Sequence, residues 1–478
     1  MKVPSHFSSF LSAQYERDTA QRLITALETE PSPVSIRLNP LKDSSAIPAA
    51  WLTEGVAWSA GLGYYLESRP AFTFDPLFHA GHYYVQEASS MFLAHALKHI
   101  LPRLADSERP LRALDLCAAP GGKSTLLRSL LPADAFLLSN EPMKQRASVL
   151  KENITKWGHP DTAVSSGYAS DIASTGCRFD LIVTDVPCSG EGMMRKEADA
   201  VAQWSEQLTH DCAKLQRSII SDIWESLNPG GFLIYSTCTF NRNEDEENVR
   251  YLCDVLGAEY IDLAPEAEWN IYTSGPSQGY HFLPHLTRGE GFFLAVVRKD
   301  ETETDTDNPS HRKKNRKKQK EAALPDRNAA SVLSAWIDEL ESYSMVWNDV
   351  QEEYSAVPKA HADFVEALRK GGLHLLQAGI PLARPKGRKL QPHAALALST
   401  ALRKDAFPEV EVTLDMARAY LRTESLVLAP EAPRGHVVIT YHGARLGFAN
   451  NLGSRANNLY PSEWRIRTTY LPTHEDVE

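Results

Sequence analysis

Short apolar runs alternate with longer amphipathic segments between residues 111 and 299, and this alternation limits the possible folds more than any other feature. The apolar runs are nearly continuous, as buried strands of a parallel sheet covered on both faces must be. They lie at residues 111–117, 135–141, 161–166, 179–188, 230–239 and 291–299. The pattern predicts a doubly wound, Rossmann-like α/β domain with the last run at the edge of its sheet.

Two segments between these runs carry clear helical signals. Residues 142–158 and 205–227 are long enough for several turns. In the second, apolar residues recur at three- or four-residue steps, which predicts one buried face. That face contains Leu208, Cys212, Leu215, Ile219, Ile223 and Leu227. Pro229, Gly230 and Gly231 predict a sharp end to this helix.

Charge is unevenly distributed along the 478 residues, which are enough for several domains. The net charge of −11 argues against uniform coating of nucleic acid, although local basic tracks remain possible. Residues 300–307 hold five acids, and residues 311–320 hold seven Lys or Arg. Such blocks cannot bury themselves, so we predict a charged linker at 301–328. The linker separates regions at 1–100, 101–300 and 329–478.

The cysteine content and the hydrophobic pattern exclude several classes of protein. Six scattered cysteines without a C-x-x-C pair predict neither a disulfide scaffold nor a metal site. No run of eighteen apolar residues occurs, and the first ten residues do not resemble a signal peptide. We therefore expect a cytoplasmic, monomeric protein that binds neither membrane nor metal.

The first predicted strand runs into a turn with the sequence DLCAAPGGKST, from Asp115 to Thr125. Its glycines allow close approach of a ligand to the backbone, and the following helix start offers free N–H groups. The end of the turn matches a phosphate-binding P-loop, but Cys117 stands where that motif requires its first glycine. Pro120 also stiffens the loop, so a P-loop ATPase is the weaker alternative.

A carboxylate stands where a ribose-binding acid is expected. Glu141 lies 20 residues after Gly121, at the end of the second predicted strand. Turn and acid together favour a nucleoside cofactor without a phosphate chain, such as S-adenosylmethionine. The predicted cofactor-binding residues are Cys117, Ala118, Ala119, Pro120, Gly121, Gly122, Lys123, Glu141 and Asp185.

Two cysteines follow neighbouring strands of the predicted sheet. Cys188 lies in DVPCSGEG, after the fourth strand, and Cys238 lies in YSTCT, at the end of the fifth. Ligands of such folds bind at the carboxyl ends of the strands, so both thiols and Asp185 are candidates for catalysis. The remaining cysteines are better explained as inert thiols: Cys177, Cys212 and Cys253.

These segments resemble the motifs of RNA cytosine-C5 methyltransferases of the Sun type, in particular the RsmF-type enzymes of small-subunit ribosomal RNA. The resemblance spans nearly the whole chain. SIRLNPLK (35–42) and VQEASSM (85–91) resemble the N-terminal part of the family. GARLGFANNLGSRANNLYP (443–461) resembles its C-terminal, PUA-like part.

The resemblance implies a Rossmann-like S-adenosylmethionine methyltransferase domain with an N-terminal RNA-binding extension and a C-terminal PUA-like α+β region. It implies methyl transfer to carbon 5 of a cytidine in RNA, most of all 16S rRNA. Cys238 would attack carbon 6 and Cys188 would assist product release. Asp185 suits the charge that develops at N3, and Lys123 would be a second polar contact near the base. DNA cytosine methyltransferases use the Pro-Cys cysteine instead, so the reverse assignment stays open.

Three further points stay open. The substrate could be tRNA, or the chain could be a non-catalytic ribosome assembly factor, although such a factor has no need of both thiols. The family usually places an acid after the third strand, where this chain has Ser165 to Tyr168, so Asp171 or Tyr168 could take that place. Arginines and aromatics after residue 430 suggest contact with RNA. They are Arg434, Tyr441, Arg445, Phe448, Arg455, Tyr460, Trp464, Arg465 and Arg467.

Overall fold

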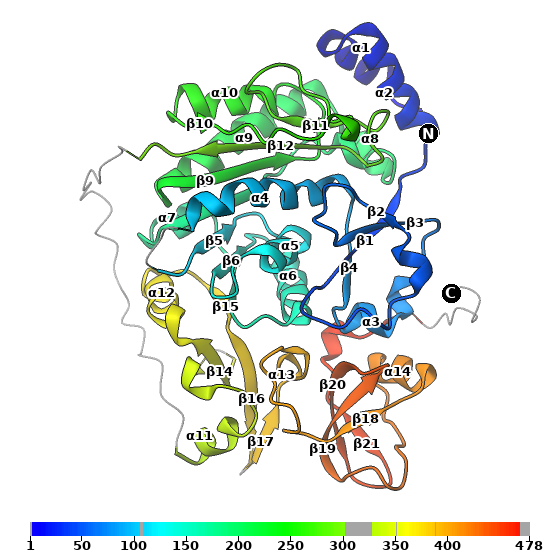
Figure 1. The fold of residues 1–478 in the computed structure, drawn as a ribbon, viewed down its shortest axis with the longest axis vertical. Coiled ribbons are helices and arrows are strands. Elements are labelled where there is room, and N and C mark those ends of the chain that lie inside the picture. Colours follow the sequence, from blue (N-terminus) through cyan, green and yellow to red (C-terminus); the bar gives the residue numbers. More distant parts are fainter. Residues whose placement is uncertain (1, 106–108, 302–326, 350, 388, 469–478) are drawn as a thin grey trace.

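The computed structural model describes residues 2–105, 109–301, 327–349, 351–387 and 389–468 (Figure 1). A nine-stranded sheet forms its centre, in the order β10, β12, β9, β8, β5, β6, β7, β15, with β11 beside β12. The strands are β5 (Arg112–Asp115), β6 (Phe136–Asn140), β7 (Thr162–Ser165), β8 (Phe179–Asp185), β9 (Leu227–Thr237), β10 (Glu259–Tyr260), β11 (Tyr280–Phe282), β12 (Phe292–Arg298) and β15 (Leu375–Ala378).

The core of this sheet confirms the predicted Rossmann-like fold. Strands β7, β6, β5, β8 and β9 run parallel, while β12 and β15 pair antiparallel at either side. The strand order reverses between β5 and β8, because chain order runs outward from β5 in both directions. The six predicted strands all form, whereas β15 comes from beyond the predicted linker and was not expected.

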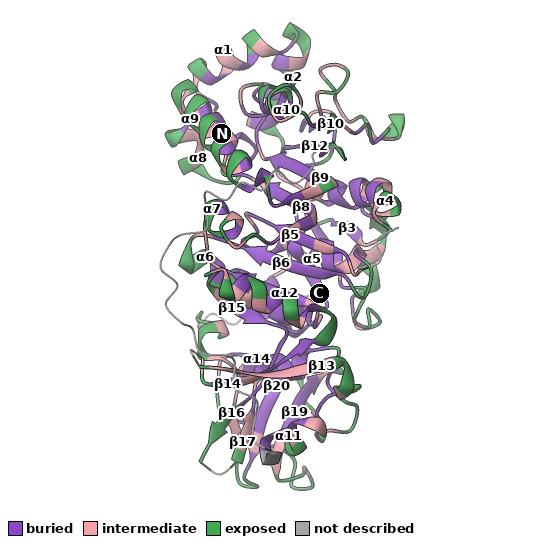
Figure 2. Cartoon of the chain, turned by 90° about the vertical axis from the view of Figure 1, so that its left-hand side faces the viewer, coloured by how far each residue is buried: buried purple, intermediate pink, exposed green. Residues whose placement is uncertain are grey.

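Helices cover both faces of the central sheet. On one face, α4 (Leu93–Leu104) and α5 (Gly122–Leu130) pack on alternate strand residues such as Ala113 and Leu137. On the other face, α7 (Ala169–Ala173), α9 (Glu206–Trp224), α10 (Glu246–Asp254) and α12 (Lys359–Lys370) pack on Leu114 and Leu138. Helix α6 (Lys144–Trp157) packs on the turn after β5. Figure 2 shows the sheet buried between these layers.

Two predictions about α9 are wrong. The helix ends at Trp224, and Pro229 to Gly231 lie inside β9, where the β8–β9 register shifts. Gly231 is needed because a Cβ there would lie 2.9 Å from the Asp180 carbonyl oxygen. The buried face is also rotated: Leu215 is exposed, whereas Thr209 and Gln216 are buried. These polar side chains are buried because they join a hydrogen-bond network described below.

The N-terminal region is a helical hairpin followed by a small sheet. Its helices are α1 (Ser5–Gln14), α2 (Arg17–Thr29) and α3 (Pro76–His79), and its strands are β1 (Val34–Leu38), β2 (Glu54–Gly55), β3 (Gly63–Leu66) and β4 (Tyr83–Val85). The sheet order is β2, β3, β1, β4. Arg37 on β1 is fully buried and donates to Gln86 Oε1 at 2.7 Å and to Thr125 Oγ1 of α5 at 2.6 Å. This guanidinium ties the N-terminal sheet to the helix that starts at the predicted cofactor turn.

Two further four-stranded sheets make up the C-terminal part. The first runs β13, β14, β16, β17 and the second β18, β19, β20, β21. Hydrophobic residues of the second share one core with the N-terminal sheet, and the views agree in placing α14 near α3 (Figure 1). The elements are β13 (Tyr343–Asn348), β14 (Glu353–Pro358), β16 (Ile380–Lys386), β17 (Lys389–Pro392), β18 (Glu409–Glu411), β19 (Gly435–Tyr441), β20 (Ala444–Asn451), β21 (Ala456–Asn458), α8 (Ala198–Gln203), α11 (Arg327–Ser334), α13 (Ala394–Leu398) and α14 (Leu414–Leu421).

Two sequence predictions meet the limits of the described residues. The predicted linker falls mainly on 302–326, outside the described ranges, and the division of the chain at residues 100, 300 and 328 stays a prediction. Among the described helices, none is both long enough and apolar enough to cross a membrane.

Helix α12 should contribute strongly to the stability of the central domain. Phe364 lies edge-on to Phe136 and Phe179, with ring centroids 5.7 and 5.6 Å away. We expect Phe364→Ala to lower the free energy of unfolding by about 3–5 kcal/mol, because it leaves a cavity under the sheet. Urea unfolding measures this. Val255→Ala, at an exposed side chain, is the control and should change stability by less than about 0.5 kcal/mol. An equally small effect of Phe364→Ala would contradict this view of α12.

Candidate active site

The two predicted catalytic cysteines lie together at the ends of neighbouring parallel strands. Asp185, the last residue of β8, pairs in register with Ser236 of β9. Both chains then leave the sheet at the same edge, and the sulfur atoms of Cys188 and Cys238 lie 3.2 Å apart. Both are free, half-buried thiols. The geometry brings two sulfur atoms to a single point of the site.

Lys123 and Asp185 form an ion pair at the same strand edge. Lys123 lies in the first turn of α5, and its Nζ is 2.8 Å from Asp185 Oδ2. Ser236 Oγ donates to the other carboxylate oxygen at 3.0 Å. Burial lowers the pKa of Lys123, but the Asp185 carboxylate outweighs it and keeps the pKa above its usual value. The lysine is therefore held as a cation beside the thiol pair.

The turn after β5 has the features predicted for a ligand-binding turn. Gly121 adopts φ +120°, where side chains are strained, and α5 begins at Gly122. Asp115 is fully buried and accepts from Ser124 Oγ at 2.6 Å. Burial raises the pKa of Asp115 to about 7. Its Oδ1 atom has no hydrogen-bond partner within the described part of the chain. Burial also raises the pKa of Cys117 to about 12, so this thiol is no nucleophile.

Glu141 lies beside this turn, as predicted. It directly follows β6, is 1% exposed, and accepts the Met143 N–H at 3.0 Å. Arg146 connects the two segments: its Nη1 lies 3.6 Å from Glu141 Oε2, and its Nη2 donates to the Ala119 carbonyl at 2.9 Å. The predicted nucleoside-binding residues therefore form one continuous surface next to β5 and β6.

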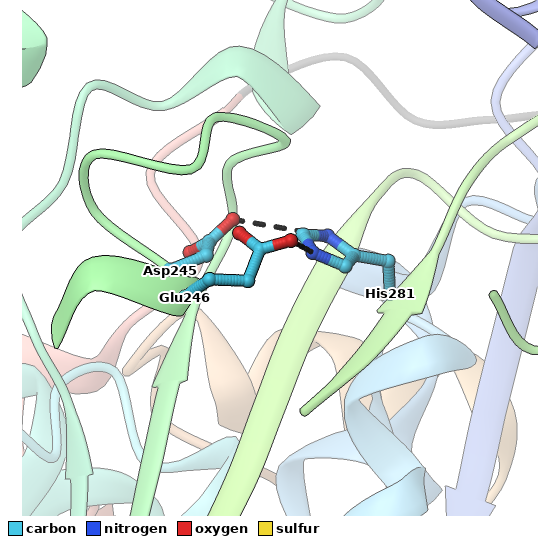
Figure 3. A group of neighbouring side chains, drawn as sticks. All are labelled: Asp245, Glu246 and His281. Carbon is cyan, nitrogen blue, oxygen red and sulfur yellow. Dashed lines mark hydrogen bonds and ion pairs between the residues drawn. The ribbon is translucent and has the colours of Figure 1, made fainter. Parts of the chain in front are cut away.

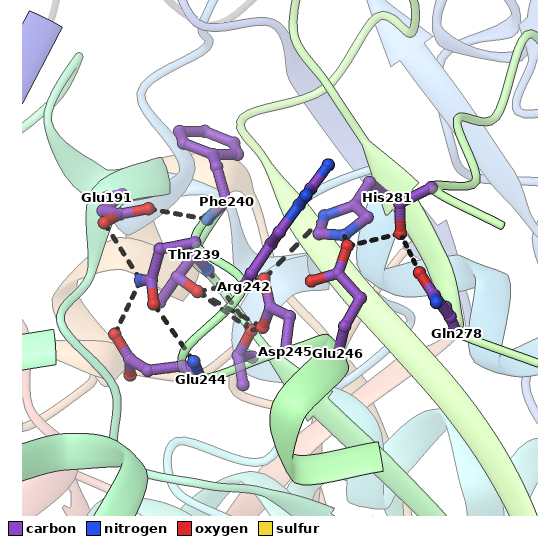
Figure 4. A network of polar contacts seen from close by, with 12 residues as sticks. Glu191, Thr239, Phe240, Arg242, Glu244, Asp245, Glu246, Gln278 and His281 are labelled. Atoms are coloured by element: carbon purple, nitrogen blue, oxygen red, sulfur yellow. Dashed lines mark hydrogen bonds and ion pairs between the residues drawn. The ribbon is translucent and has the colours of Figure 1, made fainter. Parts of the chain in front are cut away.

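A buried polar network, missed from the sequence, joins the two cysteine-bearing loops (Figure 4). Glu191, on the Cys188 loop, accepts the Phe240 N–H at 2.7 Å and the Trp204 Nε1–H at 2.9 Å. Glu244, just after the Cys238 loop, accepts the Ser189 N–H at 3.0 Å. Asn241 donates to both carboxylates, at 3.0 and 2.8 Å. Each loop thus supplies a carboxylate that binds the other loop, which fixes the distance between the thiols.

The network extends to α9, which explains the polar residues on its buried face. Gln216 donates to Glu244 at 2.7 Å and to the Pro187 carbonyl, next to Cys188, at 2.9 Å. Asn243 donates to Thr209 Oγ1 at 3.0 Å. A buried polar residue on an otherwise apolar helix face was the only sequence signal for this network.

The two thiols differ in their environment. The pKa of Cys188 is raised well above its ordinary value, first by the hydrogen bond with Cys238 and then by burial. Cys188 therefore keeps its proton and can donate it to the Cys238 sulfur.

A third group of buried side chains lies next to this network (Figure 3). Asp245, Glu246 and His281 are of the kinds that bind metals, and His281 Nε2 lies 3.1 Å from Glu246 Oε1 while its Nδ1 lies 3.8 Å from Asp245 Oδ2. Burial raises the pKa of Asp245, whereas for Glu246 His281 outweighs burial and lowers the pKa to about 2. The ion pair between Glu246 and His281 accounts for this arrangement. The sequence gave no signal for it, and the expected absence of a metal stays a prediction.

Two open questions from the sequence receive partial answers. Asp171 accepts the Tyr168 N–H at 2.8 Å and so caps α7, while the Tyr168 ring is 67% exposed. Of the C-terminal aromatics expected near RNA, Phe448 and Tyr460 are buried in hydrophobic cores. Those two rings stabilise the fold and are not available for stacking on bases.

The sheet order and the turns at its strand ends define the class of protein first: this is a Rossmann-like methyltransferase. The fold matches the solved structure of NSun6 from Pyrococcus horikoshii with SFG, at a TM-score of 0.52 and 19% identity, over 62% of this chain and 98% of that one. Family models match three segments: 16S rRNA methyltransferase RsmB/F over 103–298, the N-terminal domain of 16S rRNA methyltransferase RsmF over 3–88, and the methyltransferase RsmF PUA domain over 407–466.

Individual relatives agree with the family models over nearly the whole chain. The chain is 32% identical over 475 residues to ribosomal RNA small subunit methyltransferase F of Erwinia tasmaniensis, covering 94% of this chain and 93% of that protein. It is also 32% identical over 453 residues to the Escherichia coli O81 protein of the same name, covering 90% and 89%. The chain belongs to the RsmF family of 16S rRNA methyltransferases, which confirms the suspected relationship.

Glu191 allows a test of how the network is charged. Burial raises its pKa from 4.5 to about 7, against the opposing effect of its hydrogen bonds. The stability that the protonated carboxyl contributes is complete below pH 4.5 and lost as the pH rises through about 7. Glu191→Gln stays neutral throughout. We expect its free energy of unfolding, relative to the native protein, to rise by about 2–3 kcal/mol between pH 5 and pH 8.

Urea unfolding at the two pH values measures this change. The exposed Glu197, a few residues further on, provides the control through Glu197→Gln. A relative loss of stability of Glu191→Gln toward pH 8 would show that the hydrogen bonds hold the carboxylate ionised despite its burial.

Proposed function

We propose that this protein transfers a methyl group from S-adenosylmethionine to carbon 5 of a cytidine in 16S rRNA. The observation that carries the proposal is the approach of the Cys188 and Cys238 sulfur atoms to 3.2 Å. A Lys123–Asp185 ion pair ends at the same edge of the sheet. Membership of a 16S rRNA methyltransferase family supports the choice of RNA.

The residues beside β5 and β6 fit S-adenosylmethionine, which when bound supplies the methyl group. Glu141 can accept hydrogen bonds from both ribose hydroxyls, because one carboxylate can bind two donors. The turn around Gly121 permits close approach of the backbone, and Asp115 Oδ1 is a buried acceptor still to be satisfied. The surface carries no cluster of cations suited to a phosphate chain, since Lys123 is engaged by Asp185.

Carbon 5 of cytosine is a poor nucleophile, and a thiolate can activate it. In the proposed reaction the Cys238 sulfur forms a bond to carbon 6, and the electron pair of the 5,6 double bond moves toward carbon 5. Carbon 5 then takes the methyl group. A base next removes the carbon-5 proton, the carbon–sulfur bond breaks, and Cys238 leaves. Negative charge at N3 is met by a proton donor, a role open to Asp185 and Lys123.

The environment of the thiols supports Cys238 as the nucleophile. Cys188 keeps its proton, as the rise in its pKa indicates, and a hydrogen bond from it stabilises a thiolate on Cys238. Cys188 is then placed to assist in product release, because it touches the sulfur that must leave. The reverse assignment, as in DNA cytosine methyltransferases, is a distinct outcome of the experiment below.

Cofactor binding should depend on Glu141. We expect Glu141→Ala to weaken binding of S-adenosylmethionine by about 1.5–3 kcal/mol, because hydrogen bonds to a charged acceptor are lost. Isothermal titration calorimetry measures the affinity directly. Glu259→Ala, at an exposed edge of the sheet, is the matched control. An unchanged affinity in Glu141→Ala would remove this residue from the site.

Substitution of the two cysteines should have opposite effects on the reaction. Incubated with S-adenosylmethionine and 16S rRNA from cells that lack the protein, the native chain should form 5-methylcytidine, measured by bisulfite sequencing. Cys238→Ala should give neither product nor covalent complex. Cys188→Ala should accumulate a protein–RNA adduct that survives denaturing electrophoresis, because attack remains possible while release is impaired. The double variant should give no adduct.

Controls separate these roles from structural damage. Cys212→Ala removes a half-buried thiol away from the pair and should behave as the native chain. All variants should keep similar thermal stability. An adduct from Cys238→Ala and none from Cys188→Ala would reverse the assignment. If the native chain methylates tRNA and leaves 16S rRNA unchanged, the proposed substrate is wrong.

A further inference from the structure

A cavity of about 330 Å³ lies between the N-terminal region and the loops of the central domain. Residues 30–34, after α2, and residues 66–69, at the end of β3, form one wall. Arg195, Pro284, Arg288 and Gly289 form the other. The pocket therefore exists only where the two regions meet, and nothing in the proposed reaction has used it so far.

The inner part of the pocket contains polar atoms without partners. Arg195 donates to the Gly289 carbonyl from the central domain and to the Pro31 carbonyl, at 3.5 Å, from the N-terminal region. Its guanidinium thus holds the walls together, yet its Nε is buried and unpaired within the described residues. Ser32 Oγ, in the opposite wall, is likewise buried without a partner there. Buried polar groups of this kind cost stability unless a ligand or water satisfies them.

The rim of the pocket is cationic and its lining is largely apolar. Arg69 is exposed and lies over the Phe72 ring, 5.6 Å from its centroid. Arg288 lies over the Tyr65 ring at 4.3 Å and uses Nη1 to pair with the half-exposed Glu54. Apolar lining comes from Pro31, Pro33, Val34, Leu66 and Pro284, and two exposed acids, Glu30 and Glu67, also border it. Arginines around an apolar hollow suit a phosphate together with a ribose or base.

The pocket is connected directly to the thiol pair. Arg195 follows Cys188 by seven residues on one loop. On the other side, Gly289 is two residues from Gly291, roughly 7 Å away in an extended chain. The Gly291 carbonyl and the Cys238 carbonyl both border Gly192, 2.9 and 3.0 Å from where its Cβ would lie. A strand whose cytidine reaches Cys238 can therefore place a neighbouring nucleotide in the pocket.

We propose that this pocket binds a nucleotide of the RNA strand one or two positions from the target cytidine. Its phosphate contacts Arg69 and Arg288, its ribose or base lies against the apolar wall, and Ser32 Oγ and Arg195 Nε hydrogen-bond to it. The inference rests on the proposed function in that the strand is the one being methylated. A base turned out of its helix for reaction loses its stacking, so a grip on its neighbour offsets part of that cost.

Binding and kinetics of the full chain with 16S rRNA from cells that lack the protein test the proposal. Arg69→Gln and Arg288→Gln should each weaken RNA binding about fivefold, and the rise in KM should exceed any change in kcat. The slope of log affinity against log salt concentration should become shallower by about 0.7 for each lost phosphate contact. Arg22→Gln is the matched control, since Arg22 is exposed on α2 and does not line the pocket. Affinity for S-adenosylmethionine should stay native in all three.

The outcomes distinguish this inference from the proposed function. If Arg69→Gln and Arg288→Gln bind RNA as Arg22→Gln does, with the same salt slope, the pocket holds no nucleotide even if the native chain forms 5-methylcytidine. If the native chain forms none but the two variants still lose affinity and salt dependence, the proposed reaction fails while the pocket stands as an RNA site. Ser32→Ala, with a twofold or greater loss of affinity, would place the nucleotide inside the pocket and not only at its rim.

Discussion

The register of β8 against β9 is the constraint on which the candidate site depends. Because Asp185 pairs with Ser236, the two chains leave the sheet at one level, and the thiols two and three residues further on meet. Backbone pairing alone would not hold the loops there. The buried carboxylates of Glu191 and Glu244 do so, since each accepts an N–H of the other loop. The arrangement is costly, as burial of the two acids shows in their raised pKa values, which fits a site that spends stability on geometry.

The N-terminal region takes part in the same geometry. Tyr15 donates to the Phe240 carbonyl at 2.5 Å, and Gln14 accepts the Arg242 N–H at 2.8 Å, so the α1–α2 hairpin supports the Cys238 loop. Arg37 holds the N-terminal sheet against α5 on the other side of the site. Burial lowers the pKa of Arg37 to about 9, which still leaves it charged at neutral pH. The segments read from the sequence as mere family features therefore carry defined contacts.

Much of the fold followed from the sequence because strand runs and glycine turns are local signals. The six strands, the turn at Gly121, the acid at Glu141 and the thiols at strand ends were all placed by spacing alone. The buried face of α9 was misjudged, because Gln216 is buried for its hydrogen bonds and apolar periodicity cannot show that. The contact of His281 with Glu246 and the pairing of β15 with β7 join distant segments, so no local pattern announces them.

The pairing of β15 with β7 also sets the order in which the chain can be finished. Leu375 lies opposite Ser165, and the His374 carbonyl accepts the Ser166 N–H at 3.0 Å, next to the residues around Glu141. A nascent chain emerges from its N-terminus, at about 5–20 residues per second, so β7 stays an unprotected edge for roughly 10–40 s. Exposed edges invite pairing with foreign strands. The central sheet is thus complete only when the later part of the chain has left the ribosome, and a prematurely terminated product would carry the thiols on an unfinished and association-prone sheet.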